Sequence, residues 1–350
     1  MFFSVMSFKI IHKSFFFFLL SIMLLGILSC DSPSKKNQHS QLENMLETIN
    51  IGRLICGGHL PLAIVEKKYQ DQLKTFKLQT VQNHDWNDVI TDMKSGKLAG
   101  TFILSPLAMN MIHEGFPGKI VLMADRNGNG FILSEQIKSI SDLKNRQSII
   151  AVPHIYSQHH VLLHTLLKQY DISEGAVKVL GMPPRDMINS LRRGEIDGFL
   201  VGEPEGNKSV SLGVGWMAAI SPQIWKDHMD HVFLASDTFI NEQPEKLQEL
   251  ITQLVRGGAF IENNPQEAAI MGEDYTGSSA AVFEKVLTTP ADWISYAEMT
   301  ANENDMTTMA NKLVEMKLWP SVPENITRDY FDMRFAIKAE QTLRKKISHL

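Results

Sequence analysis

The sequence predicts an α/β protein made of two similar lobes, each a mostly parallel sheet flanked by helices, with a helical extension at the C-terminus. Three observations predict this fold class. A helix–glycine–strand–loop segment occurs twice, first in Asp88–Pro106 and again in Asp186–Pro204. Strand-like and helix-like segments alternate along most of the chain, as mostly parallel sheets require. The roughly 300 residues that follow the N-terminal leader exceed what one typical hydrophobic core needs.

The two copies of the repeat align without gaps and share five identities in nineteen positions. Each copy begins with apolar residues at helical spacing, such as Val89, Ile90 and Met93 in the first. A basic residue and a glycine then end the helix, and a short apolar strand leads into a loop that contains proline. Because ligands of open α/β sheets bind outside the carboxyl ends of strands, we expect each lobe to present one such loop to a shared cleft.

Other segments fit the same plan, since strand-like runs are followed by helix-like runs and the chain after Asp237 turns chiefly helical. We expect strands at Arg53–Cys56, Phe76–Val81, Thr101–Leu104, Lys119–Met123, Ser148–Val152 and Phe199–Val201. We expect further helices at Pro61–Leu73, Ser157–Tyr170, Pro244–Glu262, Pro265–Met271, Asn302–Met316 and Arg328–Lys346.

The N-terminus has the pattern of an export signal. Lys9 and Lys13 precede an apolar run, Ser14–Leu28, that is too short for a comfortable membrane span. The run ends in Ile-Leu-Ser-Cys and resembles the lipobox of bacterial lipoproteins, in which the cysteine, here Cys30, is lipidated. We therefore expect a signal peptide over residues 1–29 and a lipid anchor with a polar tether over residues 30–49. The mature protein would lie on the outer face of the cytoplasmic membrane, in the periplasm if the cell is Gram-negative.

Charge and cysteine content exclude some classes of function. Loss of residues 1–29 changes the formal net charge from −5 to −7, because that segment holds two lysines and no acidic residue. Mild acidity argues against nucleic acid as a partner. Cys56 is the only cysteine of the sequence besides Cys30. If Cys30 carries the lipid, the processed domain has no second cysteine with which to form an internal disulfide. Cys56 is predicted to be a buried small residue rather than a nucleophile.

The chain resembles the nitrate/sulfonate/bicarbonate-type substrate-binding proteins of ABC importers over roughly Ile51–Pro265, and the nitrate- and bicarbonate-binding branch most of all. The residues that carry the resemblance are Trp86, GKLAGTFILSP (Gly96–Pro106), NGNG (Asn127–Gly130), SISDLKNRQSIIAVPH (Ser139–His154), SQHHVLLHTLL (Ser157–Leu167), RRGEIDGFLVGEP (Arg192–Pro204) and IWKDH (Ile224–His228). The resemblance implies a periplasmic-binding-protein-like fold of type II, a monomer that delivers its ligand to a permease driven by a separate ATPase. The implied lobes are residues 50–147 and 233–350 for the first and 148–232 for the second.

The resemblance also implies ligand-binding residues, and it leaves alternatives at several of them. The matched positions are Trp86, Ser105, Asn127 and Gly130 of the NGNG turn, His159, Glu203 and Lys226. A tryptophan beside a helix start also fits the core, and a lysine such as Lys226 is more often solvated than a ligand group. The chain departs from the family pattern at Phe131, where a glutamine is usual, and at Glu205, where tryptophan is usual.

Two further binding residues follow from local chemistry. Ser157 is a plausible N-cap, and the free amides of the turn after it can hold an anion. A protonated His159 there would add positive charge, although a surface histidine is an equal alternative. His59 follows the Gly57-Gly58 turn at the end of a strand, where cleft and packing interpretations are comparable.

Metal sites and catalysis are not predicted. The run Asp125–Gly130 begins like a calcium loop, but Gln136 stands where an EF-hand needs glutamate. His160 and His164 lie one helical turn apart without the glutamate of a metalloprotease motif. No Gly-x-Ser-x-Gly elbow or acid/base pair stands out. We therefore expect no metal, no cofactor and no enzymatic activity.

The expected function is that of an extracytoplasmic lipoprotein that captures a small anionic or polar solute for an ABC importer. One alternative is a ligand sensor that signals to a membrane partner. A second is an enzyme on the same scaffold, related to pyrimidine-precursor synthases, although their Cys-rich pattern is absent. Neighbouring genes discriminate the first two, because a permease and an ATPase favour import whereas a kinase or cyclase favours sensing.

Overall fold

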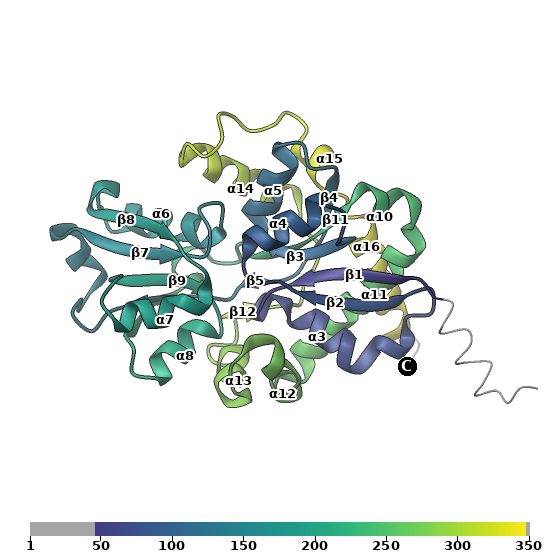
Figure 1. Ribbon diagram of the computed structural model, residues 1–350, viewed down its shortest axis with the longest axis horizontal. Coiled ribbons are helices and arrows are strands. Elements are labelled where there is room, and N and C mark those ends of the chain that lie inside the picture. The colour runs from purple at the N-terminus through teal and green to yellow at the C-terminus, as the bar shows by residue number, and fades with distance from the viewer. Residues whose placement is uncertain (1–45, 348–350) are drawn as a thin grey trace, which may run out of the picture. The chain divides into compact units, whose positions relative to one another are not determined.

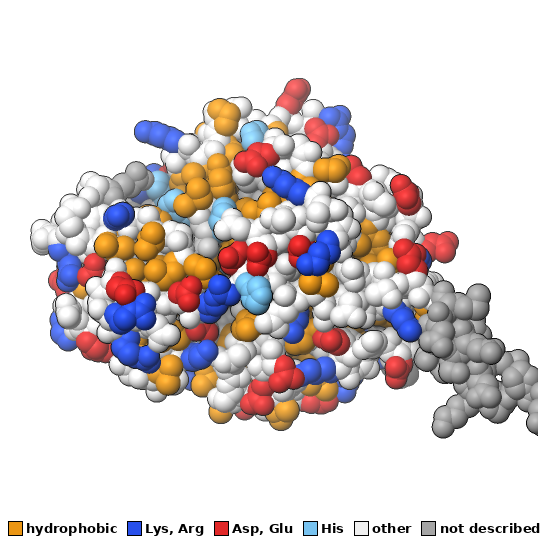
Figure 2. Space-filling model, in the orientation of Figure 1, with side chains coloured by type: hydrophobic (Ala, Val, Ile, Leu, Met, Phe, Trp, Pro, Cys, Tyr) orange, Lys and Arg blue, Asp and Glu red, His pale blue; other side chains and the backbone are white. Residues whose placement is uncertain are grey.

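The computed structural model describes residues 46–347, and from Glu47 onward they belong to one compact unit. The expected signal peptide and the lipidation site Cys30 lie outside the described residues. No helix within residues 46–347 combines the length and apolar character that crossing a bilayer requires. On the face shown in Figure 2, acidic and basic side chains are interspersed, as expected for a small net charge.

The first of two five-stranded sheets begins with the strand β1 (Thr48–Arg53). Its order is β2-β1-β3-β11-β4, and β11 runs antiparallel to both of its neighbours while the other four strands share one direction (Figure 1). The other strands are β2 (Lys77–Gln82), β3 (Gly100–Leu104), β4 (Gly118–Met123) and β11 (His231–Ser236).

The second sheet repeats this topology. Its order, β8-β7-β9-β6-β10, again has one antiparallel strand, β6, in the fourth place. The strands are β6 (Asn129–Leu133), β7 (Ser148–Val152), β8 (Val177–Gly181), β9 (Gly198–Gly202) and β10 (Trp216–Ile220). The predicted α/β class with mostly parallel sheets is therefore confirmed.

The sequence repeat occupies equivalent places in the two sheets. Each copy supplies a helix and the third strand, α4 (Trp86–Lys94) with β3 and α7 (Pro184–Arg192) with β9. The first residue of each strand, Gly100 or Gly198, pairs with the strand in the second place of its sheet, opposite Ile51 of β1 or Ile150 of β7. The repeat thus marks a real structural equivalence.

The chain crosses between the sheets twice. It leaves the first sheet after β4, passes through β5 (Arg126–Asn127), which pairs with β12 (Ile294–Ser295), and enters the second sheet as β6. It returns between β10 and β11. The expected boundary at residue 148 grouped Asn129–Leu133 with the first lobe, whereas β6 pairs with β9 and β10 in the second sheet.

Helices cover the sheets, and local sequence explains several of their starts. Asp85 caps α4 by accepting bonds from the amides of Asn87 and Asp88. Ser157 caps α6 in the same way through the amide of His160, as predicted. The other helices are α3 (Leu60–Ile64), α5 (Ser105–His113), α6 (Gln158–Gln169), α8 (Glu205–Ser211), α9 (Ser221–Ile224), α10 (Asp237–Glu242), α11 (Pro244–Asn263), α12 (Pro265–Thr276), α13 (Ala280–Thr288), α14 (Glu303–Glu315), α15 (Ile326–Tyr330) and α16 (Arg334–Ile347).

Some local predictions differ from the structure. The strand expected at Arg53–Cys56 is β1, which ends at Arg53, so Cys56 lies in the loop that follows it. The helix expected over Pro61–Leu73 is regular only in α3 and then continues as a π turn (Val65–Tyr69) and a 3₁₀ turn (Gln70–Gln72). The sequence did not predict β6, β8, β10 or β11. Strands β6 and β11 are buried almost throughout and lack the alternation that reveals half-buried strands, whereas β8 and β10 are partly exposed.

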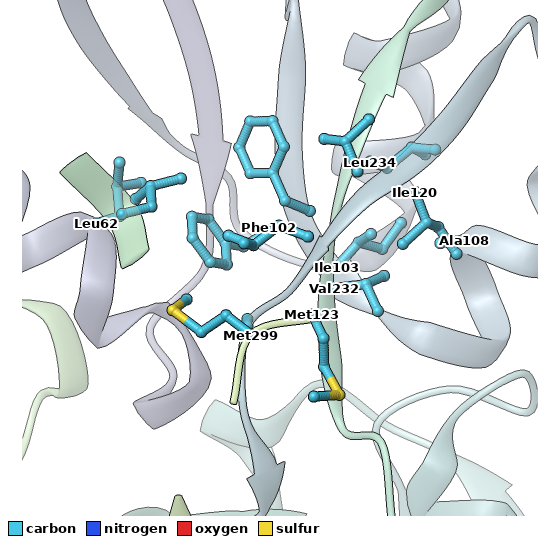
Figure 3. Packing of buried hydrophobic residues seen from close by; sticks show 14 of the residues in the cluster. Leu62, Phe102, Ile103, Ala108, Ile120, Met123, Val232, Leu234 and Met299 are labelled. Carbon is cyan, nitrogen blue, oxygen red and sulfur yellow. The ribbon is translucent and has the colours of Figure 1, made fainter. Parts of the chain in front are cut away.

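The core of the first sheet is the larger one. Side chains of β3, β4 and β11 pack against α3 and α5, and Figure 3 shows Leu62, Ile103 and Val232 among them. The C-terminal helices α14, α15 and α16 contact α5, β4 and α11, so the predicted helical extension completes this core. Two separate apolar clusters contain residues such as Phe131 and Phe199 of the second sheet.

Candidate functional site

A small cavity lies where the carboxyl ends of parallel strands from both sheets meet. Its volume is about 20 Å³, enough for one or two water-sized particles. Loops after β1, β7 and β9 line it, together with the start of the antiparallel strand β11. The polar and aromatic lining comprises Cys56, Trp86, His159, Glu203, Glu205, Thr276 and His231.

A larger groove of about 570 Å³ lies at the opposite edge of the first sheet. It is lined by Thr48–Asn50, by Gly96–Ala99 and by Gly115–Pro117, which precede or begin β1, β3 and β4. Ligands of open α/β sheets bind at the carboxyl ends of the strands. The small cavity is therefore the better candidate site despite its size.

His231 is the centre of a buried network beside the cavity. Its Nδ1 lies 2.8 Å from Oδ2 of Asp230 and 3.4 Å from Oδ1 of Asp125, and its Nε2 lies 3.4 Å from Sγ of Cys56. Burial raises the pKa of Asp125 to about 6, together with the charge of Asp230. Burial opposes ionisation of Asp230 as well, but His231 and the nearby histidines hold its pKa below the ordinary value. Asp230 is thus the more acidic of the two carboxyl groups beside His231.

His59 and His159 present unpaired ring nitrogens in the same region. His59 Nδ1 contacts the backbone of Leu54, 2.9 Å from its nitrogen and 3.1 Å from its oxygen, while Nε2 is buried without a partner. Both ring nitrogens of His159 are buried without a partner. Burial lowers the pKa of His159 to about 3 and that of His59 well below its usual value. Both imidazoles are therefore neutral at pH 7.

The glycines of the Gly57-Gly58 turn permit close approach at this site. A β-carbon on Gly58 would lie 2.2 Å from Nδ1 of His231, and one on Gly57 would lie 2.4 Å from the carbonyl oxygen of Glu203. Neither distance is possible for a real side chain. The turn therefore brings Cys56 and His59 to His231 only because both positions lack a side chain.

Trp86 and Glu203 contribute further unpaired groups. The indole of Trp86 lies edge-on to His59 with ring centres 6.1 Å apart, and its Nε1 has no partner. Oε2 of Glu203 accepts a bond from the amide of Asn207 at 2.9 Å, whereas Oε1 has no partner. Burial raises the pKa of Glu203 to about 8, so this carboxyl is largely protonated at neutral pH.

The structure brings together four of the expected binding residues and leaves the others outside the cavity lining. Trp86, His159 and Glu203 line the cavity, and His59 packs against Trp86 and His231. Ser105 donates to the carbonyl of Met229, Asn127 donates to that of Asp292, Gly130 packs under Glu203, and Ser157 caps α6. The side chain of Lys226 is 65% exposed in a different groove, 3.8 Å from Asp292.

Four residues of the network were missed as site residues: Cys56, Asp125, Asp230 and His231. Cys56 and His231 are 175 positions apart, so no local spacing links them. Asp125 does not turn outward as a calcium loop requires, because its Oδ1 accepts the amide of His231 at 3.0 Å. His160 and His164, one helical turn apart on α6, do not face a common site. His160 contacts the carbonyl of Ile155, and His164 contacts Glu315.

Two equivalent sheets with a polar cavity at their junction place the chain in the periplasmic-binding-protein-like class of folds. The model of the NMT1-like family matches residues 43–273, and the chain belongs to that family.

Curated relatives carry transport names. The nitrate import ATP-binding protein NrtC of Synechococcus elongatus is 26% identical over 257 residues, which cover 67% of this chain and 39% of NrtC. The taurine-binding periplasmic protein of Escherichia coli is 24% identical, covering 57% of this chain and 75% of that protein. The chain spans about two fifths of the length of the first curated relatives it matches.

Solved structures share the fold. The nitrate-binding protein NrtA of Synechocystis superposes with a TM-score of 0.80 at 16% identity, covering 85% of this chain and 89% of NrtA. A ligand-binding component of an ABC-type import system from Staphylococcus aureus, solved with zinc bound, gives 0.77 at 22% identity and covers 84% and 99% of the two chains. The predicted periplasmic-binding-protein-like fold is confirmed by these likenesses.

Proposed function

We propose that this protein captures a small anionic or polar solute outside the cytoplasm and delivers it to an ABC importer. The observation that carries the proposal is the cavity at the junction of the two sheets, lined by buried polar groups that lack partners. Buried polar groups without partners are costly, and a ligand that satisfies them recovers that cost. A binding role is also the role named for the relatives NrtA and the taurine-binding protein.

The solute class is argued from size and from relatives. A cavity of about 20 Å³ suits a solute of few atoms, and the named relatives include nitrate, bicarbonate and taurine systems. Among the described residues, the cavity lining contains no lysine or arginine. Hydrogen-bond donors such as Trp86 Nε1 and His159 would therefore have to replace charge in holding an anion.

A thermal-shift screen tests the binding role. Nitrate, bicarbonate, cyanate, taurine and a thiamine precursor are each added to the purified protein. A ligand at 100 times its dissociation constant adds about 2.7 kcal/mol of stability, which corresponds to roughly 4 °C for a domain of about 300 residues. Absence of any shift across this panel would contradict the proposal for these solutes.

Matched variants locate the ligand. His159→Ala and Trp86→Phe should remove most of the shift while the variants melt cooperatively without ligand. His84→Ala removes an exposed imidazole that does not line the cavity and should keep the full shift. A full shift in both cavity variants would place the solute elsewhere.

We propose further that a lipid on Cys30 holds the protein at the membrane. The two cysteines allow a matched comparison. Cys30→Ser should move the protein from the membrane fraction to the soluble fraction, whereas Cys56→Ser should not. Membrane association that survives Cys30→Ser would contradict the anchor. Sensing instead of import is distinguished by neighbouring genes and by uptake of the solute in a deletion strain.

A further inference from the structure

We propose that Cys56, His59 and His231 bind a divalent transition-metal ion such as zinc, with His159 as the fourth ligand. One ligand atom from each of the first three residues lies within 4.8 Å of the others. Thiolate and imidazole together are the ligand set that favours zinc over calcium or magnesium. The inference concerns this site and its ion, and it needs neither the importer nor a particular solute.

The distances suit a tetrahedral site. Zinc lies about 2.3 Å from sulfur and 2.0–2.1 Å from nitrogen, so its ligand atoms stand about 3.3–3.8 Å from one another. The sulfur of Cys56 and Nε2 of His231 are already 3.4 Å apart. The remaining separations of up to 4.8 Å close with shifts of about 1 Å, within the reach of side-chain rotation.

The fourth ligand comes from the other sheet. A β-carbon built on Gly202 would lie 3.4 Å from Sγ of Cys56 and 3.6 Å from Nε2 of His159, with no atom closer than 3.4 Å. The sulfur and the imidazole therefore border the same position beside Gly202. His159 lies outside the group of three whose ligand atoms are within 4.8 Å of one another, so it has to move toward the ion to complete the site. Both ring nitrogens of His159 are buried and have no hydrogen-bond partner. The unprotonated nitrogen of the neutral ring therefore has a lone pair that can bind a metal ion.

Groups behind the ligands orient them as in known zinc sites. A zinc-bound histidine usually has a carboxylate or a backbone carbonyl at its other ring nitrogen. His231 has Asp230 at 2.8 Å from Nδ1, which leaves Nε2 for the ion. His59 has the carbonyl of Leu54 at 3.1 Å from Nδ1, which leaves its buried and unpaired Nε2 for the ion.

Two other uses of these residues fit less well. Asp125, Asp230 and His231 also lie close enough to share an ion, but Asp125 accepts the amide of His231 and Asp230 accepts from Asn129. Cys56, His231 and Asp230 are spaced like a thiol–imidazole–carboxylate nucleophile. That arrangement gives no role to the unpaired nitrogens of His59 and His159.

Cobalt and zinc titrations of the full-length protein, stripped with a chelator, test the inference. Cobalt(II) should give one equivalent of a tetrahedral visible spectrum and a thiolate charge-transfer band in the near ultraviolet, and zinc should abolish both. This readout uses the unaltered protein, so it does not depend on whether a variant folds. Binding without the thiolate band, or no stoichiometric binding, overturns the proposal.

Variants assign the ligands. Cys56→Ser should remove the charge-transfer band, and His231→Ala should weaken zinc binding more than about a hundredfold, because loss of an outer-shell partner alone costs 10–100-fold. Asp230→Asn should weaken it within that smaller range. His84→Ala is the control and should bind as the unaltered protein does. Unchanged zinc affinity in Cys56→Ser and His231→Ala would overturn the assignment, whatever the solute screen finds.

Discussion

The backbone amide of Gly57 donates a hydrogen bond to the backbone carbonyl of Glu203 across 3.0 Å. Gly57 lies after β1 of the first sheet, and Glu203 lies after β9 of the second sheet. This bond joins the two loops that the sequence repeat and the Gly57-Gly58 turn bring to the cavity. It makes the contact between the sheets depend on a residue without a side chain.

Gly57→Ala should weaken ligand binding. Its β-carbon would lie 2.4 Å from the Glu203 oxygen, so the loops must separate, and overpacking of this kind costs about 1–3 kcal/mol. That cost corresponds to roughly a 5- to 150-fold loss of zinc affinity, measured by competition with a chromophoric chelator. Gly181→Ala is the control, since nothing lies within 4 Å of its β-carbon. Equal affinity in the two variants would contradict the role of this contact.

Glu203 should make stability fall as the pH rises. Because burial raises its pKa from 4.5 to about 8, the folded protein keeps a proton that the unfolded chain loses above pH 4.5. Stability from this group is therefore complete below pH 4.5 and declines up to pH 8, by at most about 1.4 kcal/mol per pH unit. Urea unfolding in the presence of a chelator should show that Glu203→Gln gains stability relative to the parent between pH 5 and pH 8.5.

The control for this prediction is Glu315→Gln. Lys168 and its neighbours lower the pKa of Glu315 to about 2, so its contribution is lost only as the pH falls from 4.5 towards 2. Its removal should leave the slope above pH 5 unchanged. A Glu203→Gln variant with the parent's slope would show that this carboxyl is ionised in the folded protein.

Arg126→Met should destabilise the protein strongly. Arg126 makes two parallel bonds of 2.9 and 2.8 Å to the carboxylate of Asp305 and thereby ties β5 to α14, with both side chains largely buried. Removal of one partner of a buried pair costs about 3–5 kcal/mol, because the other charge is left unpaired. Urea unfolding measures the loss. Lys67→Met breaks an exposed pair with Asp274 and should cost less than about 1 kcal/mol, and equal losses would contradict the prediction.

Trp319 should anchor the C-terminal segment to the first sheet. Its Nε1 donates to Asn110 at 3.0 Å, and its ring stacks on His113 with centres 4.6 Å apart. Trp319→Ala should cost about 3–5 kcal/mol, and Trp319→Phe about 1–3 kcal/mol, since the bond to Asn110 is lost while a phenyl ring still fills most of the site. The exposed Ile270→Ala is the control. An unfolding free energy of Trp319→Phe equal to that of the unaltered protein would remove the hydrogen bond from this account.

Local pattern was enough for the fold class and for part of the candidate site. The repeat placed α7 and β9 correctly, and Ser157 caps α6 as its residue type predicts. The network could not be derived in this way, because Cys56 and His231 meet only when β1 and β11, which are distant in the chain, come together in the first sheet. The direction of Lys226 is likewise set by Asp292, which lies in a distant loop.

The two sheets provide the proposed ligands of the ion jointly, with Cys56 after β1 and His159 after β7. An ion held this way cross-links the two sheets, since its bonds to ligands from both sheets also oppose their separation. Tight binding of the ion would then also slow the separation of the two sheets. A partner that binds both sheets and separates them would therefore release the ion without contacting any of its ligands.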